Sequence, residues 1–238
     1  MRLPPLVQAI FLERLNRFAG RVLVDGSPAL VHIANSGRMW ELLQRGRVCW
    51  VTPRVGAVRK TVYDLVLVDV GHTLASADAR LPSALLAEAI GERRVPAFQG
   101  WRLRGREVPF GHSRLDLLLE RDGRLCWVEA KSVTLVEEGV GLFPDAPTSR
   151  GQRHMASLVE AVGQGHRACV VFVVQREDAH AFAPNDPADP AFGEALRSAL
   201  AQGVEAYAYR CRVGLDEVRL DTPLPVWTRY PAEGHRGH

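Results

Sequence analysis

The 238-residue sequence predicts an α/β protein (α+β overall), in which a small β-barrel precedes a mixed β-sheet flanked by helices. Residues 6–70 consist of short β-branched or alternating runs separated by Gly, Pro and Asn, a pattern typical of strands. Further along the chain, helical and strand-like segments alternate. The pattern weakens at residues 71–80 into small and polar residues, so we expect two domains, at residues 1–78 and 79–238.

The first domain is predicted to contain short strands, with one helical turn at residues 38–44 between them. The strands are expected at residues 6–18, 21–25, 30–33, 47–53 and 63–70. About five short strands in some 70 residues are typical of a small barrel, and the oligonucleotide-binding (OB) fold is the leading candidate.

The second domain is predicted to begin with a helix at residues 81–90. A clearly amphipathic helix follows at residues 150–162, where Met155, Leu158 and Val162 belong to one apolar stripe. An aspartate followed by Pro190 predicts the start of a third helix, which ends near residue 202. The expected strands lie at residues 101–108, 115–120, 125–130, 168–174 and 204–213.

The composition is that of a globular protein, with 47% hydrophobic and 24% charged residues. No apolar run approaches the ~20 residues needed to cross a bilayer, and no apolar stretch precedes a cleavage site near the N-terminus. We therefore expect a cytoplasmic protein without a membrane partner. The four cysteines lie far apart and form no Cys-x-x-Cys pair, so we expect reduced thiols in the core.

The charge is distributed unevenly along the chain. Residues 1–60 hold 10 basic and 3 acidic side chains, although the net charge of the whole chain is only +3. A basic first domain fits a polyanionic partner, and it fits equally a solvated surface that binds nothing. Of the 30 basic residues 28 are arginine, and the lysines are Lys60 and Lys131. A compact ammonium differs chemically from a planar guanidinium, so a chain that strongly favours arginine is expected to keep lysine where a guanidinium will not serve. Lys131 is therefore a candidate functional residue.

A predicted β-hairpin over residues 111–132 carries the strongest chemical pattern. An Asp-Gly turn joins its strands, with Asp116 near the start of one strand and Glu129 and Lys131 near the end of the next. In an antiparallel pair those two ends lie side by side, and period-two alternation puts Glu129 and Lys131 on the same face. Asp116 is the charged exception beside an apolar run, so it is expected to join them.

Two neighbouring carboxylates repel each other unless a cation lies between them. Mg²⁺, with Mn²⁺ as the alternative, suits that place because it takes oxygen ligands and retains waters for a substrate phosphate. Such a metal polarises the phosphate and lowers the pKa of a bound water, while Lys131 orients that water or neutralises developing charge. On spacing alone, a surface hairpin with an ordinary cross-strand salt bridge remains an equal interpretation.

Short segments spread over nearly the whole chain form a further pattern. They are Leu3–Leu6, Arg14–Phe18, Asn35–Met39, Arg59–Tyr63, Gly111–Asp116, Val128–Leu135 and Gly151–His154. Together and in this order they resemble the sugar fermentation stimulation protein A family. The resemblance implies an OB-like domain followed by a PD-(D/E)XK nuclease-like domain, in a DNA-binding protein linked to the regulation of sugar metabolism.

By this resemblance, Asp116, Glu129 and Lys131 match the nuclease-like motif. Glu88 is a candidate third metal ligand, because such domains often place an acidic residue on their first helix; a solvated helix face is the alternative. The sequence departs from the family just before that helix. Residues 78–83 keep only the proline of an Asn-Thr-x-x-Pro-Asn-like stretch.

The resemblance also suggests residues that contact DNA. In the second domain they are Arg114, Arg150, Gln152, Arg153 and His154, of which Arg150, Arg153 and His154 are expected to share one helix face. In the first domain they are Arg14, Arg17, Arg38, Arg59 and Lys60, with Arg38 the leading one. Phe11, Phe18, Trp40 and Trp50 are candidate stacking platforms, although we expect at least two of these aromatics to be core residues.

Three functions are therefore compatible with the sequence. The first is a metal-dependent DNA nuclease, in which the barrel captures DNA and the second domain hydrolyses it. The second is a non-enzymatic DNA-binding regulator on a nuclease-like scaffold, for which binding without turnover and with a steep salt dependence is expected. The third is a protein that binds a small phosphorylated metabolite rather than nucleic acid.

Overall fold

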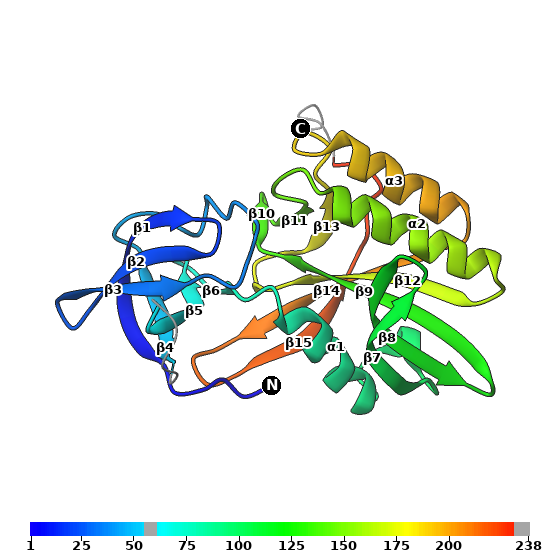
Figure 1. Cartoon of the computed structure of the whole chain (residues 1–238), viewed down its shortest axis with the longest axis horizontal. Coiled ribbons are helices and arrows are strands. Elements are labelled where there is room, and N and C mark those ends of the chain that lie inside the picture. The colour runs from blue at the N-terminus through cyan, green and yellow to red at the C-terminus, as the bar shows by residue number, and fades with distance from the viewer. Residues whose placement is uncertain (55–60, 231–238) are drawn as a thin grey trace, which may run out of the picture.

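The computed structural model describes residues 1–54 and 61–230, which form two units lying side by side (Figure 1). The described residues of the first unit form strands and turns but no helix. The strands are β1 (Val7–Asn16), β2 (Ala19–Val24), β3 (Ser27–His32), β4 (Val48–Pro53), β5 (Tyr63–Asp69) and β6 (Leu74–Ser76). Period-two alternation is visible in β2, where Val22 and Val24 are buried and Arg21 is exposed.

Strands β1 to β5 close into a barrel. β1, β2 and β3 form an antiparallel meander, and β4 and β5 continue from the other edge of β1. β5 then pairs in parallel with β3 at Val31↔Tyr63, which closes the ring. The interior is filled by apolar side chains that include Phe11, Ile33 and Leu65. This five-stranded barrel confirms the predicted OB-like fold.

The sequence predicts a helical turn between β3 and β4, and the structure has a single hydrogen-bonded turn there, with no longer helix. The N–H groups of Leu42 and Leu43 both donate to the carbonyl of Met39, which are the i→i+3 and i→i+4 hydrogen bonds of one helical turn. Met39, which precedes the interior of the turn, has a φ of 48°. The side chains of Met39 and Leu42 are fully buried in the barrel, so this turn packs against the barrel core.

The second unit contains the helices and the larger sheet. Its helices are α1 (Leu81–Gly91), the 3₁₀ helix η1 (Pro96–Phe98), α2 (Ser149–Gly163) and α3 (Pro190–Ala201). Its strands are β7 (Arg102–Phe110), β8 (Ser113–Arg121), β9 (Arg124–Val133), β10 (Leu135–Glu137), β11 (Val140–Phe143), β12 (Arg167–Val174), β13 (Ala181–Pro184), β14 (Glu205–Val213) and β15 (Val218–Leu224). Among the described residues, no helix is long and apolar enough to span a membrane.

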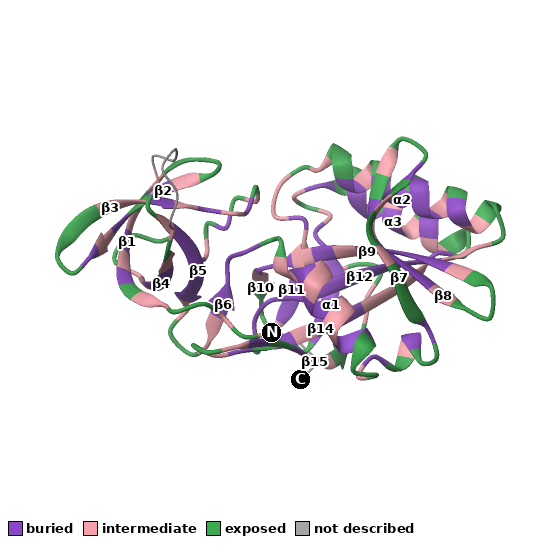
Figure 2. Cartoon of the chain, turned by 60° about the horizontal axis from the view of Figure 1, so that its bottom comes forward, coloured by how far each residue is buried: buried purple, intermediate pink, exposed green. Residues whose placement is uncertain are grey.

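The central sheet is mixed and lies between helices. Its strand order is β15-β14-β12-β9-β8-β7, with β9, β12 and β14 parallel and the outer pairs antiparallel. α1 covers one face, whereas α2 and α3 cover the other, with exposed and buried residues alternating around both helices (Figure 2). β12 is buried over almost its whole length, as is typical of a strand covered on both faces of a sheet. The predicted fold class is therefore confirmed.

A small second sheet, β10-β11-β13, and the edge strand β15 were not predicted from the sequence. β11 and β13 pair in parallel although about 40 residues separate them along the chain, as parallel pairing requires a long crossover. The four cysteines are all buried and free, as predicted.

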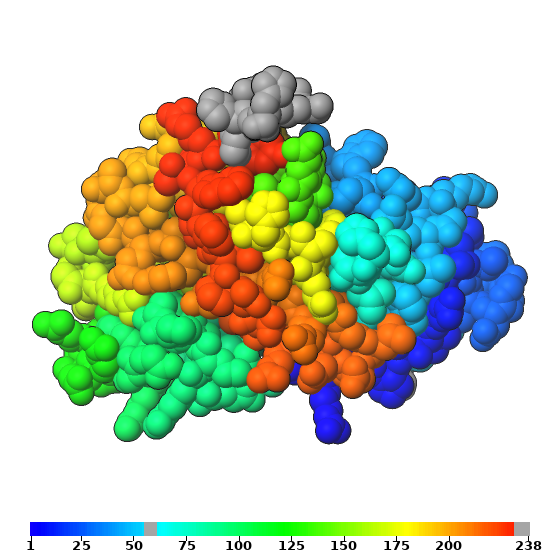
Figure 3. All heavy atoms as spheres, turned by 180° about the vertical axis from the view of Figure 1, so that it is seen from behind, coloured from blue at the N-terminus to red at the C-terminus, as the bar shows by residue number. Residues whose placement is uncertain are grey.

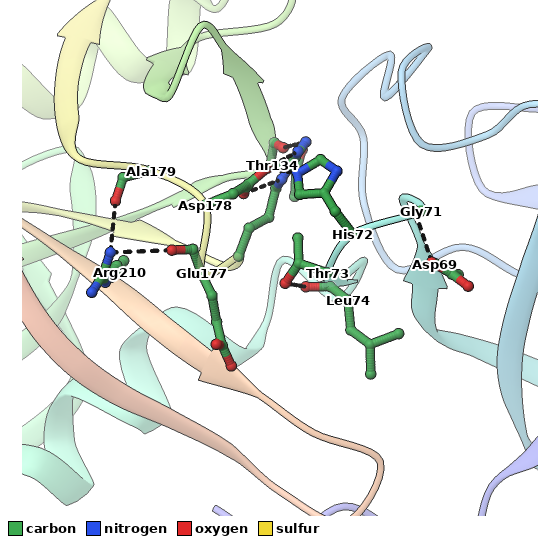
Figure 4. Close-up of polar contacts among 11 residues, drawn as sticks. Asp69, Gly71, His72, Thr73, Leu74, Thr134, Glu177, Asp178, Ala179 and Arg210 are labelled. Carbon is green, nitrogen blue, oxygen red and sulfur yellow. Dashed lines mark hydrogen bonds and ion pairs between the residues drawn. The ribbon is translucent and has the colours of Figure 1, made fainter.

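The two units meet through polar contacts around β6. The backbone N–H of Ser76 donates to the carbonyl of Gln175, and Nε2 of His72 lies 2.8 Å from Oδ2 of Asp178. Figure 4 shows His72 directed toward Asp178. Arg176 also donates two hydrogen bonds to the Asp178 carboxylate. Seen from behind, the cyan part of the first unit lies directly against the yellow and orange parts of the second unit (Figure 3). These contacts fix the barrel against the larger sheet.

One carboxylate orients the starts of both α2 and α3. Oδ1 of Asp189 accepts the backbone N–H of Phe192 at 3.0 Å as the N-cap of α3. Its Oδ2 accepts the N–H of Thr148 at 2.7 Å, and Thr148 is itself the N-cap of α2. Asp189 is only 4% exposed, so these hydrogen bonds are shielded from water. The relative position of the two helices therefore depends on Asp189.

We expect Asp189→Ala to lower the free energy of unfolding by about 1–2 kcal/mol, because both helix starts lose an acceptor. Chemical unfolding followed by circular dichroism measures this change. The matched control is Glu194→Ala on α3, whose side chain is 75% exposed; it should change stability by less than about 0.5 kcal/mol. Equal effects of the two substitutions would contradict the bridging role of Asp189.

Candidate functional site

The candidate site lies where the hairpin of β8 and β9 opens, on the sheet face covered by α2. The ladder between these strands ends at Leu117↔Val128. Beyond that point, the backbone N–H of Ala130 donates a hydrogen bond of 2.7 Å to Oδ2 of Asp116. The carboxylate of Asp116 therefore takes the place of a backbone acceptor, which holds it beside the end of β9.

Glu129 and Lys131 point to this same face of the sheet, as period-two alternation with the buried Trp127 requires. Their side chains are nearly inaccessible, with exposed fractions of 4% for Glu129 and 9% for Lys131. Nζ of Lys131 donates to Oε1 of Glu129 at 2.7 Å. The structure thus brings together Asp116, Glu129 and Lys131, the three residues that the sequence singles out.

A fourth side chain, His154, joins them from α2. Its Nδ1 donates to Oε1 of Glu129, and Nε of Arg150, one helical turn earlier, lies 3.3 Å from its Nε2. Because the Glu129 carboxylate accepts and Arg150 can only donate, we assign the ring proton to Nδ1; Nζ of Lys131, which lies 3.3 Å from Nδ1, then donates to Glu129 rather than to the ring. His154 therefore orients Glu129 from inside the protein, a role that the sequence did not predict.

The two carboxylates lie in different electrostatic environments. Burial, followed by the charge of Glu129, raises the pKa of Asp116 to about 7, against the opposing effects of the Ala130 N–H and Lys131. Burial alone would raise the pKa of Glu129, but Lys131 and His154 outweigh it and lower that pKa below its usual value. Without a cation, the pair therefore keeps Glu129 charged and lets Asp116 take up a proton near neutral pH.

The donor set fits a hard divalent cation. Oε2 of Glu129 is buried and has no hydrogen-bond partner within residues 1–54 and 61–230, and a buried charged oxygen without a partner costs free energy. A cation beside it would satisfy this oxygen and remove the repulsion from Asp116. The described part of the chain holds no cluster of three or more His, Cys, Asp or Glu ligands. Mg²⁺, however, commonly uses one or two carboxylates and keeps several waters.

The structure does not bring Glu88 to this site, although the resemblance suggested it as a metal ligand. Leu85 and Leu86 pack α1 against the face of the sheet that carries Leu117 and Val128, which is opposite to the face of Glu129. Oε2 of Glu88 instead pairs with the α-ammonium of Met1 at 2.8 Å. The sheet therefore separates Glu88 from the other two carboxylates.

The remaining residues predicted on α2 differ in burial. His154 is only 5% exposed and points toward β9, whereas Arg153 and Arg150 are exposed and Gln152 is half-buried. Arg150, Arg153 and His154 do share one helix face, as their spacing requires, and Nε of Arg150 contacts the His154 ring, but that face is buried at His154. His154 is buried because it contacts Glu129 at the polar site, next to the apolar stripe of α2. The sequence pattern could not distinguish His154 from a solvated residue. Arg114 is exposed on β8, two residues before Asp116.

In the barrel, the predicted DNA-contacting residues divide between the surface and the interior. Arg38 and Trp40 are exposed, and Phe18 is 48% exposed. Phe11 fills the barrel core and Trp50 packs against the core of the second unit, in accord with the expectation that at least two of the aromatics are core residues. Arg59 and Lys60 lie outside the described residues.

Comparison with known proteins assigns both units to one family. Residues 12–77 match the "SfsA N-terminal OB domain", and residues 80–217 match the "Sugar fermentation stimulation protein RE domain". A "Sugar fermentation stimulation protein homolog" of Moorella thermoacetica is 46% identical over 224 residues, which cover 93% of this chain and 96% of that protein. The homolog of Desulforamulus reducens is 42% identical over 94% of this chain and 93% of its own length.

A solved structure shows the same arrangement. It is described as the structure of Pyrococcus furiosus SfsA in complex with Ca²⁺, and it superposes with a TM-score of 0.89 at 35% sequence identity. The superposition covers 95% of this chain and 98% of that chain. The order of barrel and sheet, and the way the two pack, are therefore features of related proteins as well.

The raised pKa of Asp116 predicts a pH dependence of stability in the presence of EDTA. Between the ordinary value of 3.8 and about 7, the folded state holds more protons than the unfolded state, so the free energy of unfolding falls as the pH rises through this window. Asp116→Asn removes this contribution. Urea unfolding should show Asp116→Asn gaining about 1–3 kcal/mol over the wild type between pH 5 and pH 8. A difference independent of pH would contradict the buried carboxylate pair.

Divalent cations are expected to stabilise the protein through the same pair. Saturating Mg²⁺ or Mn²⁺ at about 100 times its Kd should add about 2.7 kcal/mol of stability, measured as a rise in Tm. The rise should disappear in Asp116→Asn, which keeps the shape of the side chain but not its charge. Glu88→Gln is the matched control and should keep the full response, because Glu88 lies on the other face of the sheet. A Tm rise that persists in Asp116→Asn would show that the metal binds elsewhere.

Proposed function

The chain belongs to the sugar fermentation stimulation protein family, and we propose that it is a DNA-binding protein with a metal-dependent nuclease site. In this proposal, residues 1–78 bind DNA in the cytoplasm and residues 79–238 hydrolyse its phosphodiester bonds. One observation carries the proposal. Two carboxylates, one with a buried oxygen that has no described partner, meet a buried lysine at the open end of a hairpin.

Asp116 and the free Oε2 of Glu129 would hold Mg²⁺ or Mn²⁺. A bound ion of this kind supplies Lewis acidity at the scissile phosphate and lowers the pKa of a bound water. Glu129 can offer Oε2 because Lys131 and His154 both bind its other oxygen, Oε1. The related Pyrococcus protein was solved with Ca²⁺, and Ca²⁺ also takes oxygen ligands. That similarity supports a hard cation at this site.

Lys131 supplies the positive charge that phosphoryl chemistry needs. Its ammonium lies at the Glu129 carboxylate, 3.3 Å from Nδ1 of His154, where it can orient a water or offset charge that builds on the phosphate. A guanidinium is larger and planar, and it would not fit this crowded place equally well. This explains why a chain with 28 arginines among its 30 basic residues keeps a lysine here.

DNA is the proposed partner because the barrel is basic and carries exposed aromatic side chains, both of which favour nucleic acid. The family name connects its members to sugar fermentation. We propose that this connection is indirect and runs through DNA rather than through a bound sugar.

The proposal is tested by following cleavage of labelled single- and double-stranded DNA with Mg²⁺ or Mn²⁺. Wild-type protein should cleave, and Lys131→Ala should lower the rate by about 100-fold or more, because a preorganised charge is lost from the transition state. Arg104→Ala is the control, since Arg104 is an exposed residue that pairs with Glu120, and it should cleave at the wild-type rate.

Full cleavage by Lys131→Ala, in a preparation free of contaminating nuclease, would rule out the proposed mechanism. If the wild type binds DNA with a steep salt dependence but does not cleave it, the second candidate function is favoured. In that case the protein is a non-enzymatic DNA-binding regulator that uses the nuclease-like domain for binding only.

A further inference from the structure

A groove of about 630 Å³ separates part of the barrel from the segment that leads into α2. Its barrel side is formed by the end of β1, the β1–β2 turn and the β3–β4 connection, and Ala146 and Pro147 form its other side. The volume lies within the range of about 300–1,000 Å³ that is usual for ligand sites. The groove is distinct from the carboxylate site, because it contains none of Asp116, Glu129 and Lys131.

Arg14 holds the barrel side of this groove in shape. Its Nη1 donates to the carbonyls of Gly37 and Arg38 at 2.7 and 2.6 Å, and its Nη2 donates to the carbonyl of Arg17 at 2.6 Å. Nε adds a hydrogen bond to the carbonyl of Asn16. One guanidinium thus ties the β1–β2 turn to the β3–β4 connection. The groove walls are therefore preorganised before any ligand arrives.

The other side of the groove is tied to the barrel by Asp145. Its Oδ2 accepts the backbone N–H of Met39 at 3.0 Å. The Asp145 carboxylate passes so close to Gly37 that a Cβ at that position would lie 2.5 Å from Oδ2. A side chain at Gly37 would force the Asp145 carboxylate to move away from its position beside the Met39 N–H. The groove is therefore a fixed feature of the junction between the units.

The groove combines positive charge with an exposed aromatic ring. Arg14, Arg17 and Arg38 line it, and none of its lining residues is acidic. Arg17 and Arg38 form no ion pair with any residue of the described ranges. Trp40 lines it as well, and its side chain is 75% exposed, more than that of any other large hydrophobic residue described. Such exposure costs free energy unless a partner covers the ring.

We propose that this groove binds an unpaired nucleotide of single-stranded DNA, with its base stacked on Trp40 and its phosphates against Arg17 and Arg38. Arginine-lined grooves with exposed aromatic rings bind single strands because every base has a flat face that can stack. In duplex DNA those faces are covered by neighbouring bases, so a base must be unpaired to use the ring. The inference rests on the proposed function for the identity of the polymer, but it does not require cleavage.

The first turns of α2 connect the groove to the carboxylate site. Pro147 in the groove directly precedes Thr148, the N-cap of α2. From the start of α2 to His154 the helix rises about 7.5 Å, which is about the length of two stacked nucleotides. A strand anchored at Trp40 would therefore pass along the exposed side chain of Arg150 toward Glu129. The groove thus specifies single-stranded DNA, or DNA with an unpaired end, as the substrate class.

The test is fluorescence anisotropy in EDTA, with a labelled oligothymidine and a blunt duplex of equal length. Trp40→Ala should weaken binding of the single strand about tenfold, the effect of one lost base stack, and should change duplex binding by less than about twofold. Trp40→Phe should retain most of the affinity. Leu215→Ala, also at an exposed hydrophobic residue but outside the groove, should bind like the wild type. Arg38→Ala should reduce the salt slope by about one.

Each outcome separates this inference from the nuclease proposal. Unchanged single-strand affinity in Trp40→Ala, or an equal loss for duplex and single strand, would overturn the inference whether or not the protein cleaves DNA. Trp40-dependent binding by a wild type that never cleaves would uphold the inference and contradict the nuclease. Unchanged Tm values confirm that the variants fold, as expected for an exposed side chain.

Discussion

The buried carboxylate of Glu129 is the group around which the candidate site is organised. A charge with 4% exposure is tolerated only because Lys131 and His154 donate to the same oxygen. That arrangement leaves Oε2 free and places a second carboxylate, Asp116, where its own proton is hard to lose. The unpartnered oxygen of Glu129 and the raised pKa of Asp116 have one cause: two carboxylates lie close together in a buried place, and the proposed cation would offset their repulsion.

Since His154 belongs to α2, the position of this helix determines how His154 contacts Glu129. Asp189 sets the start of α2 through Thr148, and Asp145 ties the segment just before it to the barrel. The same short segment lines the groove that contains Trp40. The proposed binding at the groove and the geometry of the carboxylates would therefore be linked through a single structural element. Such a linkage would give a physical reason for the barrel and the nuclease-like domain to occur in one chain.

Local patterns in the sequence were enough for several elements and failed for others. The alternating pattern of β2 and the apolar run at residues 168–174 of β12 are local signals, and both segments are strands in the structure. The turn expected at residues 38–44 is present as a single hydrogen-bonded turn, but the local pattern did not indicate that the barrel buries Met39 and Leu42. The pairing of β11 with β13 could not be predicted either. Parallel partners are distant along the chain, and no hairpin turn between them marks the pairing in the sequence.

The sequence by itself predicted the barrel and the mixed sheet from the order of strand-like and helical segments. It also predicted that Asp116, Glu129 and Lys131 lie together, because a hairpin is local and its register determines which side chains are neighbours. Tertiary structure alone decided the rest of the site. His154 joins Glu129 because α2 lies on that face of the sheet, and Glu88 is excluded because α1 lies on the other. Packing of whole elements sets these relations, and the periodicity of a single helix contains no information about the face of the sheet on which it will lie.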